Sequence, residues 1–136
     1  MSSKKVWNYP IKAAVFDVDG TILDTEKYYY QANKIMSGDP NFPFSFQKKL
    51  SKFSGKDVAK EIINEYHLNM TPQEFLQKRR LVLHELLPSS TLISGVEHIV
   101  RTIYGMKIPM AVGTSAWSCN HKIKISKLKK FFSFSI

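Results

Sequence analysis

The fold is set by Ala13-Ala14-Val15-Phe16-Asp17-Val18-Asp19-Gly20-Thr21, an apolar run that ends in two carboxylates separated by one residue. An apolar run followed by glycine is typical of a buried strand that enters a tight loop, so Asp17 and Asp19 are predicted at the carboxyl end of a strand. Open parallel sheets bind ligands at that end of their strands. Two carboxylates so close together repel each other unless a cation relieves them, and the pair therefore predicts a metal site.

The composition indicates one modest globular unit. The chain has 136 residues, of which 43% are hydrophobic, and its net charge of +9 suits anionic ligands from phosphate esters to nucleic acid. Charge alone does not choose between these partners. A single cysteine, Cys119, excludes an internal disulfide, and no stretch has the length of a signal peptide or a membrane span. These features predict a cytoplasmic protein that does not enter a membrane.

Helical patterns without an intervening strand fill the chain between residues 24 and 91. Apolar residues recur at helical spacing up to a stop at Ser37-Gly38, and again after Pro43 and after Ser54. Thr71-Pro72-Gln73-Glu74 is a capping box with proline at the first helical position. Pro88 is predicted to end the helix behind it. The spacing therefore predicts four helices.

A second buried strand is predicted within residues 107–115. The amphipathic segment before it begins at Ser94-Gly95-Val96 and stops at Gly105, which predicts a helix that returns the chain to the sheet. This connection places Thr114 beside the acidic loop if the two strands are neighbours. The tail from Trp117 contains five lysines and no acidic residue, and we interpret it as a basic helix that docks on the sheet before a third strand begins near Phe131–Phe134.

The segment Asp17-Val18-Asp19-Gly20-Thr21, placed after an apolar strand, resembles the first motif of haloacid dehalogenase-like hydrolases, most of which are magnesium-dependent phosphatases. The chain is most similar to the branch that contains pseudouridine-5'-phosphatase and β-phosphoglucomutase, and within it to a fungal member. The resemblance implies an α/β fold, in which a Rossmann-like core with a parallel sheet carries an inserted all-helical cap. It assigns residues 1–23 and 92–136 to a partial core and residues 24–91 to the cap.

The same resemblance implies a set of catalytic roles. Asp17 corresponds to the nucleophile that forms an aspartyl-phosphate, and Asp19 corresponds to the general acid and base. Both residues belong to the Mg²⁺ site, Asp19 through its carbonyl. Ala111-Val112-Gly113-Thr114-Ser115 resembles the second motif, in which the hydroxyl of Thr114 holds the phosphoryl group and Ser115 adds a backbone donor.

Two cap positions have a functional interpretation and a plain alternative. Gly55 and Lys56 match a cap loop that faces the catalytic carboxylates in related proteins, where a lysine can bind a phosphate or sugar oxygen of the substrate. The alternative is a solvated surface lysine. Asp24 either reaches the site, as the resemblance implies, or only caps the first helix.

The sequence departs from the family pattern after Thr114. Full members continue with a lysine in a Lys-Pro context and with an acidic pair that completes the magnesium site, and this chain contains neither. We therefore interpret it as a C-terminally truncated member.

The predicted function is hydrolysis of a small phosphate monoester, such as a sugar or nucleoside phosphate, with a phosphorylated metabolite as partner and no membrane or nucleic acid. The alternatives are a catalytically inactive remnant, a phosphomutase and a basic nucleic-acid-binding module that uses the lysine-rich tail. No feature of the sequence indicates an oligomeric state.

Overall fold

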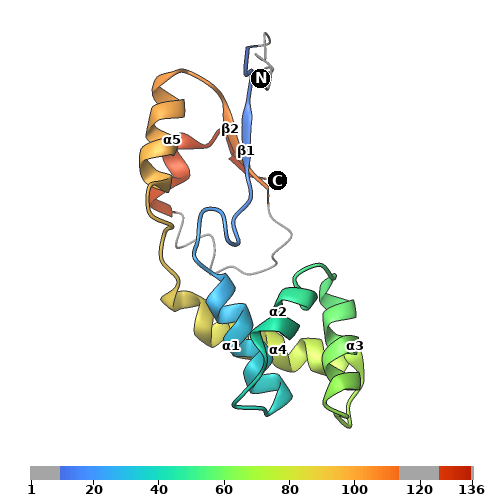
Figure 1. The fold of residues 1–136 in the computed structure, drawn as a ribbon. Helices are drawn as coiled ribbons and strands as arrows, with labels where there is room; N and C mark the ends of the chain where they lie inside the picture. The colour runs from blue at the N-terminus through green and yellow to red at the C-terminus, as the bar shows by residue number, and fades with distance from the viewer. Residues whose placement is uncertain (1–9, 114–125, 136) are drawn as a thin grey trace, which may run out of the picture.

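The computed structural model describes residues 10–113 and 126–135, which form two groups of elements (Figure 1). The first group contains a parallel sheet in the order β1-β2-β3. Its strands are β1 (Ala14–Phe16), β2 (Met110–Val112) and β3 (Phe134–Ser135). The two strands predicted before Asp17 and within residues 107–115 are therefore present and adjacent. A third strand follows near Phe134, as predicted for the tail.

The register of β1 and β2 brings their carboxyl ends to the same edge of the sheet. Ala14 lies opposite Met110 and Phe16 opposite Val112. The pairing continues beyond the strands, because the Gly113 amide donates a hydrogen bond to the Phe16 carbonyl at 2.9 Å. The helix α5 (Val96–Gly105) makes the return connection, as the amphipathic pattern predicts.

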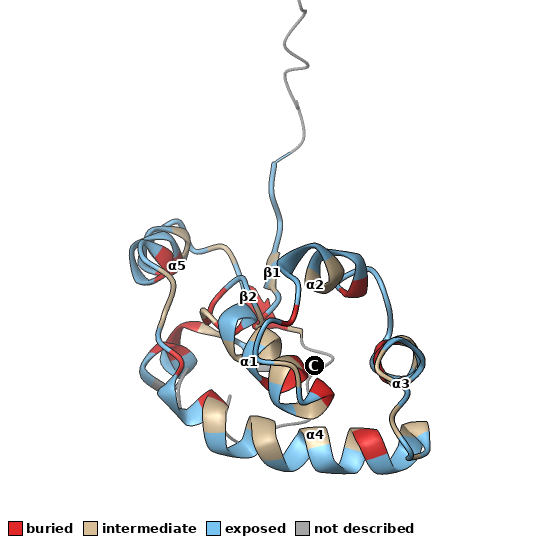
Figure 2. Ribbon diagram, turned by 60° about the horizontal axis from the view of Figure 1, so that its bottom comes forward, coloured by how far each residue is buried: buried red, intermediate tan, exposed pale blue. Residues whose placement is uncertain are grey.

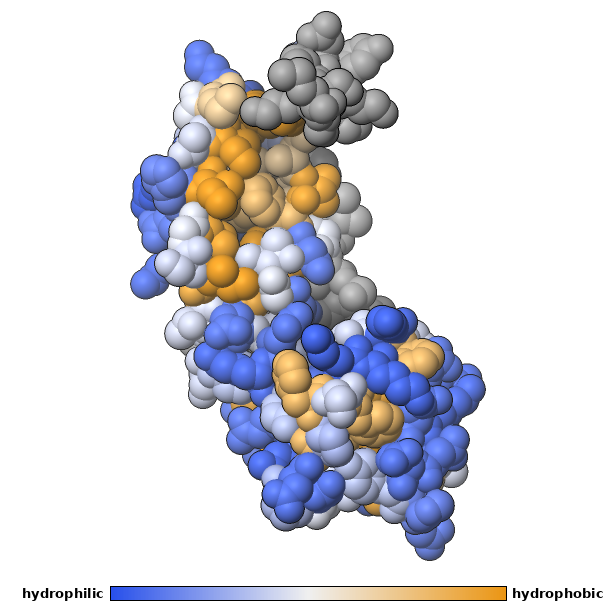
Figure 3. Space-filling view, in the orientation of Figure 1, coloured by the Kyte–Doolittle hydropathy of each residue, from blue (hydrophilic) through white to orange (hydrophobic). Residues whose placement is uncertain are grey.

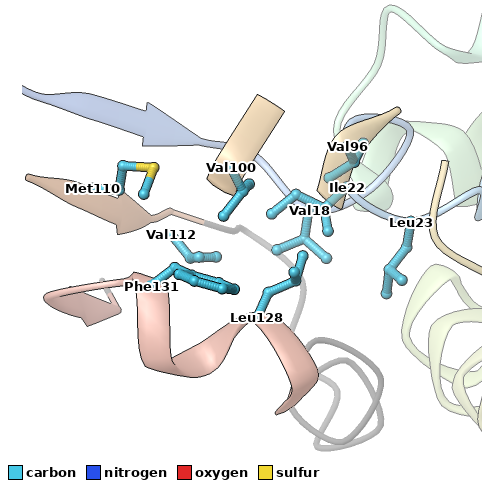
Figure 4. Packing of buried hydrophobic residues seen from close by; sticks show 9 residues of the cluster. All are labelled: Val18, Ile22, Leu23, Val96, Val100, Met110, Val112, Leu128 and Phe131. Carbon is cyan, nitrogen blue, oxygen red and sulfur yellow. The ribbon is translucent and has the colours of Figure 1, made fainter. Parts of the chain in front are cut away.

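One face of the sheet is covered by α5 and by the 3-10 helix η2 (Ser126–Phe131). Figure 4 shows Met110 and Val112 of β2 clustered with Val100 of α5 and with Leu128 and Phe131 of η2, and all five side chains are buried. For residues 126–131 this packing confirms that the lysine-rich tail docks a helix on the sheet, since Lys127, Lys129 and Lys130 stay exposed while Leu128 enters the cluster. The preceding part of the tail, residues 117–125, lies outside the described residues.

The opposite face of β1 is apolar and exposed. Val15 is 65% exposed and the preceding Ile11 is 71% exposed, although parallel sheets are usually covered on both faces. Figure 3 shows hydrophobic side chains gathered over the sheet and α5, whereas the surface of the other helices is mostly hydrophilic.

The second group of elements is a helical insertion, which we define as residues 26–89. It lies between β1 and α5 in the chain and projects from the carboxyl-end edge of the sheet (Figure 1). Its elements are α1 (Glu26–Ser37), α2 (Phe44–Leu50), α3 (Gly55–Glu65), α4 (Pro72–Leu86) and the 3-10 helix η1 (Leu87–Ser89). The four predicted helices are therefore confirmed. The assignment of residues 24–91 to a separate cap domain stays a prediction.

The helical insertion has its own hydrophobic cluster, which is separate from the one on the sheet. Its members are almost completely buried, and they are Phe42, Leu50, Val58, Ala59, Ile62 and Phe75. Figure 2 shows α4 with its exposed side outward and its buried and half-buried residues toward the other helices. None of the described helices has the length and apolar content that a membrane span requires.

The helix ends follow the local sequence signals. Thr71 accepts a hydrogen bond from the Glu74 amide at 3.2 Å, and the Glu74 carboxylate accepts one from the Thr71 amide at 2.7 Å, so the predicted capping box is confirmed. Gly38 ends α1 with φ of 72°, a left-handed conformation that glycine adopts without strain. Pro88 lies in η1, directly after α4.

The apolar stripes are narrower than the sequence predicts. The spacing of Phe46, Leu50 and Phe53 predicts one core stripe, but Phe53 follows the end of α2 and is 40% exposed. The helical spacing of Ile99 and Tyr104 with Val96 and Val100 predicts that they share the buried side of α5, but they are 51% and 54% exposed. Helical spacing identifies the side of a helix that is apolar, but the width of the buried stripe depends on how many neighbouring elements cover it.

We expect amide hydrogen exchange to be slower in the helical insertion than in the sheet. The helical insertion is stabilised by local helix caps and by its own buried hydrophobic cluster, whereas the strands are short and β1 exposes one face. Exchange measured by mass spectrometry should show greater protection for α3 and α4 than for β2 and η2. Equal or reversed protection would mean that the sheet with its single covered face is the more stable part.

Candidate functional site

Asp17 and Asp19, the two acidic residues of the first motif, lie in a loop at the end of β1 that is held by several backbone hydrogen bonds. The Val18 carbonyl accepts hydrogen bonds from the amides of Ile22 at 3.0 Å and Leu23 at 2.9 Å. Val18 itself is completely buried in the core cluster (Figure 4), whereas Asp17 is exposed and Asp19 is half-buried. The loop therefore presents Asp17 and Asp19 at the edge of the sheet where β1 and β2 end.

Gly20 makes the turn of this loop. Its φ of 68° lies in the left-handed region, and its amide donates to the Leu23 carbonyl at 2.9 Å. A Cβ atom at this position would come within 3.2 Å of the Glu26 carboxylate. Any side chain at position 20 would therefore strain the loop and crowd the start of α1.

The two carboxylates have different surroundings. Asp17 is exposed, and its Oδ1 accepts a hydrogen bond from the Val18 amide at 2.8 Å. Asp19 is half-buried. Because β1 ends at Phe16, the pair lies in the loop and not on a buried strand face, which lowers the desolvation that the sequence led us to expect for Asp17.

A cavity of about 910 Å³ connects this loop to the helical insertion. Its walls include Asp19 from the loop, Thr25 before α1, and residues from α1, α2, α3 and α4. The Thr25 hydroxyl is completely buried, and it has no hydrogen-bond partner among the residues that the structure describes. A buried hydroxyl without a partner costs about 1–3 kcal/mol, so a ligand or a water in the cavity would stabilise this position.

Tyr29 of α1 stands beside Asp19 in the wall of the cavity. The pKa of the Tyr29 hydroxyl is raised to about 12, first by burial and then by the negative charge of Asp19 and a hydrogen bond with it, against the opposing charge of Arg79. Tyr29 is therefore a neutral donor to Asp19 at every physiological pH.

The polar wall of the cavity continues from Tyr29 into the helical insertion. The guanidinium carbon of Arg79 lies 5.5 Å from the centre of the Tyr29 ring, and Arg79 Nε donates to Asn33 Oδ1 at 2.8 Å. Asn33 is 1% exposed, and its Nδ2 donates to Gln47 Oε1 at 2.9 Å. Burial lowers the pKa of the Arg79 guanidinium from its ordinary value, but the group stays charged at neutral pH.

Sequence reasoning did not identify Arg79, Asn33 or Gln47, although one signal was available. Tyr29 and Asn33 are four residues apart on α1, on the side of the helix where Ala32 and Asn33 are buried. Polar side chains at that spacing on a buried side need partners from another element. The sequence alone does not show that the partners come from α2 and α4.

Gly55 and Lys56, the two cap residues identified from the sequence, differ in their position relative to the cavity. Gly55 lines the cavity, but it is the first residue of α3, with Ser54 as N-cap, and not part of a loop. Lys56 is exposed and does not line the cavity. Gly55 therefore lies where the loop after α2 becomes α3, and the roles of Gly55 and Lys56 in binding a substrate stay predictions.

Asp24 does not cap α1. Its carboxylate forms an ion pair with Lys27 at 2.8 Å, and Thr25 occupies the N-cap position. Asp24 also lines the cavity, as the resemblance implies. Thr114 and Ser115 lie outside the described residues, and their roles stay predictions.

The loop has the donor set that Mg²⁺ prefers. Mg²⁺ binds oxygen ligands and usually takes one or two carboxylates while it keeps several waters. Asp17 and Asp19 supply carboxylate and carbonyl oxygens of this kind at an accessible edge. Within the described residues no cluster of three or more His, Cys, Asp or Glu side chains could form a closed metal site. An open, water-rich magnesium site therefore fits this loop.

Relatives of the chain are found over most of its length. A family model described as "Haloacid dehalogenase-like hydrolase" matches residues 14–136. The chain is 26% identical over 127 residues to (DL)-glycerol-3-phosphatase 2 of Arabidopsis thaliana, and this match covers 90% of this chain and 53% of that protein. It is also 26% identical over 122 residues to "Probable pseudouridine-5'-phosphatase" of Drosophila melanogaster, and this match covers 88% of this chain and 52% of that protein. The chain spans about half the length of these relatives.

The fold is also similar to solved structures. The β-phosphoglucomutase of Clostridium difficile matches with a TM-score of 0.71 and 21% identity, over 93% of this chain and 61% of that chain. At this identity the likeness shows the fold alone. It confirms the predicted α/β class, a Rossmann-like parallel sheet with an inserted group of helices.

Replacement of Tyr29 tests its contact with Asp19. In a spectrophotometric titration, the wild-type chain should show one tyrosine that ionises near pH 12, and the Tyr29→Phe variant should lack it. A raised pKa in the folded state means that the stabilisation from Tyr29 is fully present below the ordinary tyrosine pKa of about 10 and is lost as the pH rises toward 12.

The exposed Tyr104 provides the control, because Tyr104→Phe should leave the late ionisation in place. The difference between the wild-type and Tyr29→Phe titrations gives the ionisation of Tyr29. If Tyr29 ionises near the ordinary tyrosine pKa of about 10, its contact with Asp19 is contradicted.

Proposed function

The chain belongs to the haloacid dehalogenase-like hydrolase family, and we propose that it acts as a magnesium-dependent phosphatase on a small phosphate monoester. The observation that carries the proposal is the acidic loop, which presents Asp17 and Asp19 where β1 and β2 end and beside a cavity of about 910 Å³. The names of the matched relatives support it, because they describe phosphatases of glycerol phosphate and of pseudouridine phosphate.

Asp17 is the nucleophile in this proposal. The Val18 amide holds Oδ1, and Oδ2 attacks phosphorus in line with the ester oxygen. The bond between phosphorus and the ester oxygen breaks, and its electron pair leaves with that oxygen. The product is an acyl phosphate on Asp17, and exposure of Asp17 at the sheet edge makes the approach of a phosphate possible.

Asp19 moves the protons. In its protonated form it gives a proton to the leaving oxygen, and its carboxylate then takes a proton from the water that attacks phosphorus and releases inorganic phosphate. This second attack regenerates the Asp17 carboxylate. Tyr29, whose hydroxyl hydrogen-bonds with Asp19, would hold the Asp19 carboxyl in place.

Mg²⁺ would neutralise the negative charges of the phosphoryl oxygens and of the Asp17 carboxylate, which otherwise repel each other. The residues that would hold it are the carboxylate of Asp17 and the carbonyl of Asp19. Thr114 and Ser115 would bind the phosphoryl oxygens through a hydroxyl and a backbone amide. Gly55 would let the substrate approach the start of α3, and Lys56 would reach it only from the rim of the cavity.

The proposal is tested by the place of the covalent intermediate. With Mg²⁺ and beryllofluoride, which mimics a phosphoryl group on a carboxylate, fluorine NMR should detect one adduct that disappears in Asp17→Asn. Hydrolysis of a phosphate monoester should fall about a thousandfold or more in the same variant, because the nucleophile is lost.

Glu97→Gln is the matched control, since Glu97 forms an exposed ion pair with Arg101 on α5, away from the loop. An adduct on another carboxylate would disprove the assignment of Asp17. Absence of both the adduct and hydrolysis in the wild-type chain would favour an inactive remnant.

A further inference from the structure

The cavity beside the acidic loop carries opposite charges on its two sides. Asp19, Asp24 and Glu26 line it from the loop and the start of α1, together with Lys27, which pairs with Asp24, and Arg79 and Lys48 line it from α4 and α2. The acidic side fits a metal-bound phosphate, as proposed above. The cationic side is where the rest of a substrate would lie, because a phosphate monoester held at Asp17 has to extend away from the loop.

Arg79 is a partly buried cation that forms no ion pair with the carboxylates of the described residues. Ion pairs in the described part of the chain join Lys27 to Asp24, Lys49 to Glu61, Lys60 to Asp57 and Arg101 to Glu97, and none of them includes Arg79. The contacts of Arg79 are a neutral amide and a neutral ring. A guanidinium that is removed from water without a counter-ion is unfavourable, so an anion at this position would be bound strongly.

The orientation of the guanidinium is fixed in advance. Asn33 Oδ1 accepts from Arg79 Nε at 2.8 Å, and Asn33 is held in turn by Gln47 at 2.9 Å. These bonds join three helices, α1, α2 and α4, and they use one nitrogen of the planar fork. A guanidinium presents two further nitrogens that bind a carboxylate or phosphate in a bidentate manner. Because the orienting bonds exist before a ligand arrives, little side-chain entropy is lost on binding.

Tyr29 contacts both charged sides of the cavity. Its hydroxyl interacts with Asp19, and the guanidinium carbon of Arg79 lies 5.5 Å from the centre of its ring. Tyr29 therefore links the acidic loop to the guanidinium of α4.

We propose that Arg79, oriented by Asn33 and Gln47, binds a second anionic group, a carboxylate or a phosphate, on the leaving part of the substrate. This inference rests on the proposed phosphatase function, since it takes the first phosphate to lie at Asp17. It predicts a preference for phosphate esters with two anionic groups over esters of neutral alcohols.

The experiment measures binding, so it does not depend on turnover. Phosphonocarboxylates with two to four carbons and the matching phosphonoalcohols are titrated against the full chain with Mg²⁺ by calorimetry. In wild type the best carboxylate should bind about tenfold or more tightly than its alcohol, because only it satisfies the guanidinium. Arg79→Gln should remove this difference. Arg80→Gln should retain it, since Arg80 is the exposed neighbour on α4.

A second measurement covers the possibility that Arg79→Gln does not fold. In the wild-type chain labelled with nitrogen-15, the side-chain Nε signal of Arg79 should shift on addition of the carboxylate and remain in place with the alcohol. Equal affinity for both compounds, or no binding of either, would overturn the inference. Equal affinity together with an adduct on Asp17 would overturn it while the phosphatase function stands.

Discussion

The burial of three apolar side chains in the acidic loop determines the position of everything that could do chemistry in this chain. Val18, Ile22 and Leu23 are completely buried, and each contributes about 1.5–3 kcal/mol of hydrophobic stabilisation. The same loop also fixes both ends of the helical insertion. Leu23 forms an antiparallel bridge with Leu92, and the Asp24 amide donates to the Thr91 carbonyl at 2.9 Å. One small core therefore sets the direction of the carboxylates and the position of the helices opposite them.

This arrangement explains why residues far apart in the sequence share one cavity. Tyr29 follows the acidic loop by one turn of α1, so its position beside Asp19 comes directly from the bonds of the loop. Arg79 reaches the same cavity because α4 packs along α1, where Asn33 accepts its hydrogen bond. Asp19 and the partly buried Arg79 both line the cavity, whereas the exposed Asp17 lies outside its lining, at the end of β1.

Local signals were sufficient to predict most of the fold. The apolar run before Asp17, the capping box at Thr71 and Gly38 after α1 each depend on their immediate neighbours, and each is confirmed. The exposure of Phe53 could not be predicted, because it depends on which elements lie nearby in space. The contact between Asn33 and Arg79 joins residues 46 positions apart, and helical spacing on either helix alone does not reveal it. The position of the acidic loop could be predicted because it depends on one segment, whereas the polar wall of the cavity was missed because it requires three helices.

The central claim is that the loop after β1 is the cation and phosphate site, and paramagnetic mapping with Mn²⁺ in place of Mg²⁺ tests it most directly. In a nitrogen-15 spectrum, substoichiometric Mn²⁺ should first broaden the amides of residues 17–21 and that of Gly113, which the pairing of β1 and β2 holds beside the loop. Excess Mg²⁺ should restore these signals. Broadening centred on exposed carboxylates of the helical insertion, such as Glu65 or Glu85, with residues 17–21 unaffected, would contradict the account.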